Sequence, residues 1–163
     1  MKNWHSSQRG WFAGILYDLM KEDKDIWLLT GDLGFKMFDK IKEDFPDRFI
    51  NCGASETAMV GIAVGLALEN RKPFVYTITS FFLRAAETIS LYLDHENVPV
   101  RLCGAGRDDD YKDDGFSHYG MEAQKFINSA GIMEFYPESK EDVPEMVKKM
   151  VNLDNPSFIS LRR

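Results

Sequence analysis

Short apolar runs alternate with segments that carry apolar residues at helical spacing along most of the chain. The runs end at glycine or polar residues and predict buried strands, whereas the longer periodic segments predict helices. The predicted strands are residues 26–30, 49–52, 74–78, 98–103, 131–136 and 157–161, and the predicted helices are residues 10–21, 35–44, 55–69, 81–93, 121–130 and 141–151. This order predicts one α/β domain over residues 1–163, a three-layer, doubly wound and mostly parallel sheet of about six strands with helices on both faces.

Polar residues and glycines gather where the predicted strands end. They are Asp32, the turn at residues 53–56, residues 79–81 and the polar loop at residues 107–120. Ligands of doubly wound sheets bind beyond the carboxyl ends of the strands, so we expect the ligand site at this edge. Within the loop, the aspartate-rich residues 108–114 fail the EF-hand pattern. They fit either a solvated, mobile loop or a lid over a substrate.

Four ordered motifs resemble the pyrimidine-binding domain of the transketolase family. The strongest is RFINCGASETAMVGIAVGLA at residues 48–67, and it is followed by TSFFLRA at 79–85, DGFSH at 114–118 and PSFISLRR at 156–163. The resemblance extends from Arg9 to the end of the chain. It implies a thiamine diphosphate enzyme, in which the cofactor acts as an electron sink for a two-carbon unit.

By this resemblance, Glu56 is the residue that activates the cofactor. A buried carboxyl that hydrogen-bonds N1′ of the aminopyrimidine favours the imino tautomer, which removes the C2 proton of the thiazolium ring. Without the motifs, a glutamate at a helix start is interpreted as a residue that favours the helix dipole, with Ser55 as the N-cap. Thr57 departs from the Gln or His that is common after this glutamate, which puts a relay through that residue in doubt.

Three further positions resemble residues near the cofactor. Phe81 matches the aromatic residue that stacks on the pyrimidine, and Phe82 beside it is assigned to the core. Ile78 occupies a position that is often aromatic in the family and here offers only apolar contact. Asp32 matches an aspartate near the cofactor, although it also suits a turn or cap.

Two residues resemble positions near the substrate. His118 matches a histidine that hydrogen-bonds sugar hydroxyls and moves a proton near the reacting carbonyl. Arg84 matches an arginine that faces a substrate phosphate in a relative that condenses pyruvate with glyceraldehyde phosphate. An ion pair between Arg84 and Glu87 is an equal alternative, because the two lie three residues apart on one predicted helix.

Charge, hydropathy and cysteine content limit the classes of partner and the cellular location that we expect. A net charge of −6 and a pI of about 5.1 argue against nucleic acid. No membrane partner is expected, because no apolar run is long enough to cross a bilayer. The segment after Met1 lacks the apolar core of a signal peptide, so a cytoplasmic location is expected. Cys52 and Cys103 form no CxxC pair and are predicted to be reduced and buried.

The family's second domain carries a Gly-Asp-Gly motif and holds the diphosphate through Mg²⁺ or Ca²⁺, and the Gly-Asp-Leu at residues 31–33 does not match that motif, so we do not expect this domain here. The resemblance therefore implies a split enzyme, inactive alone, whose separate diphosphate-binding subunit holds the metal and completes an α₂β₂ assembly. Gly61 and Gly65 lie one turn apart on one predicted helix and permit close packing of another helix. The resemblance implies that this helix lies near the subunit interface. No metal ligand is predicted in this chain itself.

The expected reaction is transfer of a two-carbon ketol unit between sugars or sugar phosphates. The DGFSH loop favours sugar handling. A second interpretation is another thiamine diphosphate reaction, such as decarboxylation of a 2-oxo acid or a 1-deoxyxylulose-phosphate-synthase-like condensation. A third is a non-catalytic subunit that supports a partner. The donor, the acceptor and the pathway stay open at this point.

Overall fold

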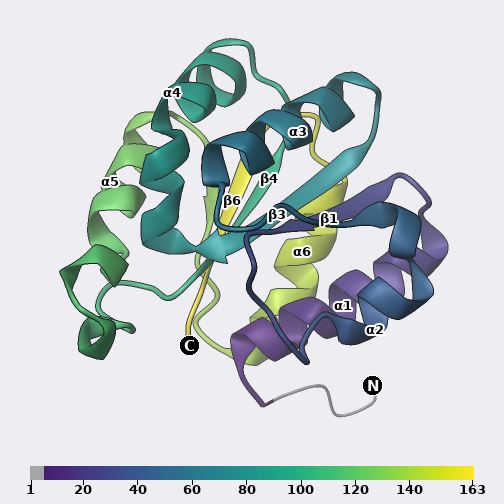
Figure 1. Ribbon diagram of the computed structural model, residues 1–163, viewed down its shortest axis with the longest axis horizontal. Coiled ribbons are helices and arrows are strands. Elements are labelled where there is room, and N and C mark those ends of the chain that lie inside the picture. The colour runs from purple at the N-terminus through teal and green to yellow at the C-terminus, as the bar shows by residue number, and fades with distance from the viewer. Residues whose placement is uncertain (1–5) are drawn as a thin grey trace.

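Six parallel strands form one sheet in the order β2-β1-β3-β4-β6-β5 (Figure 1). The computed structural model describes residues 6–163, so the first five residues of the predicted domain lie outside the described residues. The strands are β1 (Ile26–Thr30), β2 (Phe49–Asn51), β3 (Lys72–Ile78), β4 (Arg101–Ala105), β5 (Met133–Phe135) and β6 (Ser157–Leu161). The predicted α/β fold with a parallel sheet is confirmed.

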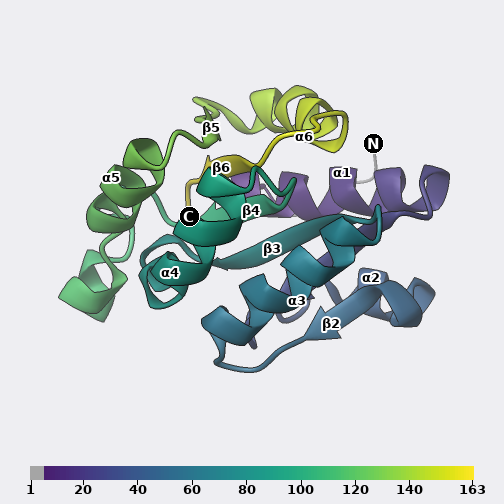
Figure 2. The same cartoon turned by 90° about the horizontal axis from the view of Figure 1, so that it is seen from above.

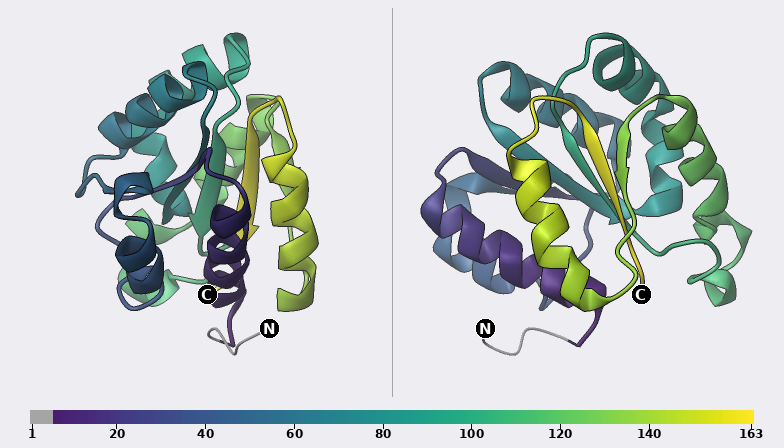
Figure 3. Two further views of the ribbon diagram at one scale, coloured as in Figure 1. Left: turned by 90° about the vertical axis from the view of Figure 1, so that its right-hand side faces the viewer. Right: turned by 180° about the vertical axis from the view of Figure 1, so that it is seen from behind.

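Helices cover both faces of the sheet. They are α1 (Gln8–Glu22), α2 (Asp39–Asp44), α3 (Glu56–Leu68), α4 (Ala86–Thr88), α5 (Met121–Ser129) and α6 (Val143–Val151). Figure 2 shows α1 and α6 on one side of the sheet and α3 on the other, and Figure 3 shows α1 and α6 crossing the same face. Within residues 6–163, no helix is both long and apolar enough to cross a membrane.

Each face of the sheet has its own hydrophobic core, because successive side chains of a strand point to opposite faces. Under α1, α2 and α6 lie Phe12, Phe38, Phe74 and Tyr76, whose rings contact one another. Under α3 and α5 lie Leu29, Val75, Phe82 and Phe158. Full burial of such a side chain contributes about 1.5–3 kcal/mol, so these layers fix the sheet on which the polar edge is built.

The strand order reverses beside β1, which lies between β2 and β3. The chain passes from β1 to β2 on one side and then returns to β3 on the other. This reversal separates the loops that follow β1 and β3 and leaves room for a ligand at their carboxyl ends. Asp32 follows β1, Glu56 begins the helix that follows β2, and Phe81 lies in the 3₁₀-helix that follows β3.

The predicted helix at residues 35–44 is shorter than expected, because α2 begins only at Asp39. Gly34 has φ +79°, and a Cβ there would lie 2.3 Å from the Phe38 ring. Lys36 also has positive φ, and its backbone N–H donates to Asp39 Oδ1. Residues 34–38 therefore form turns and not a helix. The sequence predicted a helix here because Phe35 and Phe38 are three residues apart, which is also a helical spacing.

The predicted helix at residues 81–93 is helical in the structure, but only one turn of it is α-helix. A 3₁₀-helix (Thr79–Ala85) leads into the single turn of α4, and a π-helical segment (Ile89–His95) follows. The buried apolar residues are Phe82, Ala85, Ile89 and Leu93, so their spacing widens from three to four. Tight winding followed by wide winding keeps all four against the sheet.

Candidate active site

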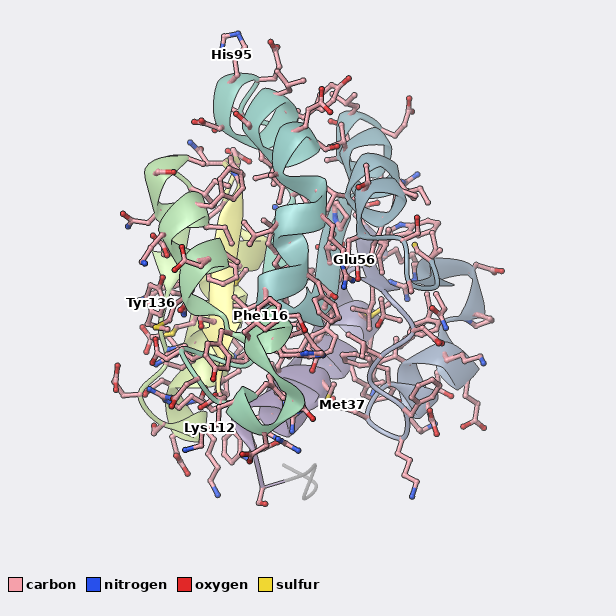
Figure 4. All side chains as sticks on the ribbon, turned by 60° about the vertical axis from the view of Figure 1, so that its left-hand side comes forward. Met37, Glu56, His95, Lys112, Phe116 and Tyr136 are labelled. Atoms are coloured by element: carbon pink, nitrogen blue, oxygen red, sulfur yellow. The ribbon has the colours of Figure 1, made fainter. Side chains whose placement is uncertain are left out.

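Glu56 begins α3 and is almost fully buried, with 3% of its side chain exposed. Gly53 has positive φ and turns the chain from β2 into the helix, where Ser55 occupies the N-cap position without a side-chain cap bond. Glu56 Oε1 accepts a hydrogen bond from Arg84 Nη1 at 2.8 Å. A carboxylate at a helix N-terminus is also favoured by the helix dipole. Figure 4 shows Glu56 between α3 and the segment that leads into α4.

Arg84 covers the face of Phe81. Residues three apart are eclipsed in a 3₁₀-helix, so both side chains lie on one side of the segment. The Arg84 Cζ lies 3.9 Å from the centroid of the Phe81 ring, within the range of a cation–π contact. The predicted pair between Arg84 and Glu87 is not the arrangement found, because the guanidinium is directed to Glu56 instead.

Two hydroxyl groups hold this segment in place. The fully buried Thr79 Oγ1 donates to the carbonyl oxygens of Ala105 and Gly106, at 3.2 and 2.6 Å, at the end of β4. The Thr57 Oγ1, on the first turn of α3, donates to the Arg84 carbonyl oxygen at 2.7 Å. Thr57 therefore fastens the segment that carries Phe81 to the helix that carries Glu56.

His118 approaches Phe81 from the polar loop. The two ring centroids are 5.1 Å apart and the planes meet at 61°, which is an edge contact. The Nδ1 atom lies 3.1 Å from the neighbouring Ser117 Oγ. The structure therefore brings together four of the predicted site residues, with Phe81 between Arg84 and His118.

Ile78 belongs to a neighbouring cavity of about 370 Å³ at the carboxyl ends of β1, β3 and β4. Its walls are Ser7, Arg9, Leu33, Gly34, Phe35, Met37, Tyr76, Ile78, Ala105 and Tyr111. Arg9 Nη1 donates to the Tyr111 hydroxyl at 2.8 Å, while Arg9 Nε is buried with no hydrogen-bond partner among the described residues. The sequence pattern did not single out either residue: Arg9 lies just before the predicted helix at residues 10–21, and Tyr111 lies within the predicted polar loop.

Asp32 lies apart from this group. It is exposed, has φ +58°, and exchanges hydrogen bonds with Asn51: its backbone N–H donates to Asn51 Oδ1 at 2.9 Å and its Oδ1 accepts from Asn51 Nδ2 at 3.2 Å. The same Asn51 oxygen accepts from the N–H of Gly53. Asp32 therefore fits the turn residue that the sequence left as an alternative, and Asn51 is a further polar residue of this edge that the pattern did not single out.

The end of the chain holds the aspartate-rich loop. Arg162 pairs with Asp108 and Asp110 at 3.2 and 3.0 Å, and the Arg163 guanidinium lies over the Tyr111 ring at 5.0 Å. These contacts tie residues 108–114 to the end of β6, at the same edge as His118. Figure 4 labels Phe116, an exposed side chain that follows this stretch and begins the turn that ends at His118.

Neither cysteine forms a disulfide. Cys103 is fully buried and Cys52 is half-buried, and burial raises the pKa of both thiols. Over residues 6–163, no three His, Cys, Asp or Glu side chains are grouped as metal ligands.

Comparison with known proteins gives the chain its family. Residues 7–163 match the model of the transketolase pyrimidine-binding domain. The chain is 34% identical over 138 residues to the transketolase of Homo sapiens, covering 83% of this chain and 22% of that protein. It is 26% identical over 155 residues to a subunit of the apulose-4-phosphate transketolase of Phocaeicola vulgatus, covering 93% of this chain and 50% of that protein.

A second class of enzyme and a solved structure are also similar to the chain. A 1-deoxy-D-xylulose-5-phosphate synthase of Clostridium perfringens is 29% identical over 157 residues, covering 93% of this chain and 25% of that protein. A solved structure described as a split gene transketolase, inactive beta4 tetramer, superposes with a TM-score of 0.84 at 25% identity, covering 96% of this chain and 51% of that chain. The chain thus spans between about a quarter and a half of the length of these relatives. The chain belongs to the family of transketolase pyrimidine-binding domains.

Proposed function

We propose that this chain is the pyrimidine-binding subunit of a split, thiamine diphosphate-dependent transketolase-type transferase. The observation that carries the proposal is a buried carboxyl group, Glu56, beside the face of an aromatic ring, Phe81. When bound, thiamine diphosphate supplies an electron sink for a two-carbon unit. The residues fit its aminopyrimidine, because a planar group with N–H donors, the Arg84 guanidinium, already contacts both.

Each residue then has a distinct task at the pyrimidine. Glu56 shares a hydrogen bond with a ring nitrogen, and its burial strengthens that bond because water does not compete. Phe81 stacks on the ring, which contributes about 0.5–1.5 kcal/mol beyond burial. Ile78 gives an apolar contact from the end of β3. We assign Asp32 a supporting part through the Asn51 turn, without direct contact to the cofactor.

The substrate is proposed to enter between His118 and the loop of residues 108–114. The imidazole of His118 donates or accepts hydrogen bonds to sugar hydroxyls and moves a proton near neutral pH. Arg84 provides a half-exposed cation for a phosphate group. The contacts from Arg162 hold the loop at the rim of the site, which supports its use as a lid.

A separate diphosphate-binding subunit is proposed to complete the site, in an α₂β₂ assembly with Mg²⁺ or Ca²⁺ held mainly by that partner. The Phocaeicola vulgatus relative, which is named as one subunit of a transketolase, and the split-gene structure support a divided enzyme. On α3, Gly61 and Gly65 are exposed, a Cβ added at either would meet no atom of another segment within 4 Å, and the exposed Ile62 lies beside them. This surface is the proposed contact with the partner subunit. We propose a cytoplasmic location for the assembly.

A second candidate is a thiamine diphosphate reaction that starts from a 2-oxo acid. The 1-deoxy-D-xylulose-5-phosphate synthase relative favours it, since its identity to this chain is in the same range as that of the Phocaeicola vulgatus protein. A supporting subunit without catalysis is the third outcome that an experiment must separate.

The test combines this chain with the product of a neighbouring gene that encodes a Gly-Asp-Gly motif and a downstream Asn. With thiamine diphosphate and Mg²⁺ present, sugars, sugar phosphates and pyruvate are screened as donors. We expect ketol transfer only from the mixture, and Glu56→Gln is expected to lower turnover by about 10²-fold or more. Glu87→Gln, at an exposed position of the same region, is the matched control.

The outcomes separate the candidates. Turnover with pyruvate alone favours the second reaction class. Full turnover in Glu56→Gln with assembly intact leaves a supporting role. Ketol transfer by this chain without a partner overturns the divided enzyme.

A further inference from the structure

The Arg84 guanidinium makes both contacts that the proposed function requires of the cofactor's pyrimidine. It donates to the Glu56 carboxylate at 2.8 Å, and its Cζ lies over the Phe81 ring, 3.9 Å from the ring centroid. A guanidinium is planar and carries N–H donors along its edge, as a protonated aminopyrimidine does. Two such groups cannot occupy one face of Phe81 at the same time.

The burial of Glu56 explains why its carboxylate needs a cationic partner. The carboxyl is 3% exposed, so a charge there without a partner would be strongly unfavourable. Among the described residues, Arg84 is the cation paired with it. The ion pair thus gives the carboxylate a hydrogen-bond partner and fixes its orientation.

The Arg84 side chain is free to move away from Glu56 and Phe81. Its side chain is 52% exposed, so the guanidinium can move into water without losing a packed environment. Its backbone is held separately, because Thr57 Oγ1 donates to the Arg84 carbonyl oxygen at 2.7 Å. A change of side-chain rotamer therefore uncovers Glu56 and Phe81 while the segment itself stays in place.

We propose that Arg84 is a positioning residue that occupies the pyrimidine site until the cofactor displaces it. The inference rests on the proposed function, since it needs the pyrimidine to bind at Glu56 and Phe81. Binding then exchanges the Arg84–Glu56 ion pair for a hydrogen bond between Glu56 and the pyrimidine, and the measured affinity is scaled by the fraction of molecules in which Arg84 leaves the site uncovered. If Arg84 covers nine-tenths of the molecules, the apparent Kd is about ten times the intrinsic one.

The test measures the binding of 4-amino-5-hydroxymethyl-2-methylpyrimidine and of thiamine diphosphate by ligand-observed NMR and calorimetry. The variants are Arg84→Met, Arg84→Lys, Glu56→Gln and the control Arg71→Met, which removes an equal charge from an exposed ion pair with Asp25. We expect Arg84→Met to bind the pyrimidine about tenfold more tightly, Arg84→Lys to be intermediate, and Arg71→Met to match the unmodified protein. Thermal melting confirms that each variant is folded.

A second readout follows Arg84 directly through its guanidinium ¹⁵N signals. Hindered rotation is expected in the free protein, and rapid rotation is expected in Glu56→Gln or after the pyrimidine is added. Unchanged or weaker binding by Arg84→Met overturns the displacement. If Glu56→Gln still loses binding, the proposed pyrimidine site survives that result. Equal binding by the unmodified protein and Glu56→Gln overturns both.

Discussion

Gly104, on β4, lies where any side chain would collide with the residue that anchors the site segment. A Cβ there would lie 2.5 Å from Thr79 Oγ1 and 2.8 Å from the nearest atom of the Phe158 ring. Thr79 and Phe158 are both fully buried, so neither can move aside freely. Gly104→Ala therefore forces Thr79 away from the two carbonyl oxygens that its hydroxyl contacts.

The cost has two parts. Overpacking of a well-packed core costs about 1–3 kcal/mol, and the disturbed hydrogen bonding of a buried hydroxyl adds about 1 kcal/mol. A loss of about 2–4 kcal/mol lowers the Tm of a chain of this size by about 4–16 °C. Thr79 lies two residues before Phe81, so binding of the pyrimidine should weaken as well.

Gly61→Ala is the matched control, because the same atoms are added where nothing lies within 4 Å. Gly61 is an exposed residue inside α3, and alanine there should raise stability by about 0.5–1 kcal/mol. Calorimetry of the isolated chain should thus give Tm changes of opposite sign for the two variants. In a double-mutant cycle, Gly104→Ala should cost less when Thr79 is already alanine. An unchanged Tm in Gly104→Ala, or additive costs in the cycle, would refute the collision.

Two further predictions concern titratable groups. Burial alone would raise the pKa of Asp23, but its lysine partner and a backbone N–H outweigh burial and hold that pKa below its usual value. Stability from this carboxylate is present above the unfolded pKa of about 3.9 and is lost as the pH falls through the folded pKa. Denaturant unfolding should therefore show a deficit in Asp23→Asn near pH 6 that closes below about pH 4, and a deficit that persists at pH 2 would contradict the assignment. Iodoacetamide at pH 8 should label the half-buried Cys52 slowly and Cys103 only on unfolding, because burial raises the pKa of both thiols; labelling of Cys103 at the rate of Cys52 would contradict its burial.

The order of strands and helices could be predicted because it follows from residue periodicity, which each element carries within itself. β1 and β6 have the predicted bounds. The failures occur where backbone conformation, rather than apolar spacing, decides the element. At Gly34 and Lys36 positive φ values delay the start of the helix to Asp39, and at Thr79 a buried side-chain hydrogen bond accompanies the start of a tighter winding.

The candidate site shows the same division. Motif resemblance identified Glu56, Phe81 and His118, and the structure gathers them at one edge of the sheet. It did not identify Arg9 or Asn51, because their roles depend on distant partners. Arg9 contacts a hydroxyl 102 residues away in sequence, and Asn51 exchanges hydrogen bonds across 19 residues.

Arg84 illustrates why local spacing could not settle its partner. Helical spacing of three residues favoured a carboxylate on its own helix, whereas the carboxylate found is 28 residues earlier, beyond a whole strand. Burial explains why Arg84 pairs with Glu56 and not with Glu87. An exposed ion pair on one helix contributes only a few tenths of a kcal/mol to stability. The buried carboxylate of Glu56, in contrast, has no water to replace its partner. If the pyrimidine binds there as proposed, it must therefore supply its own donor to Glu56 in place of the Arg84 guanidinium.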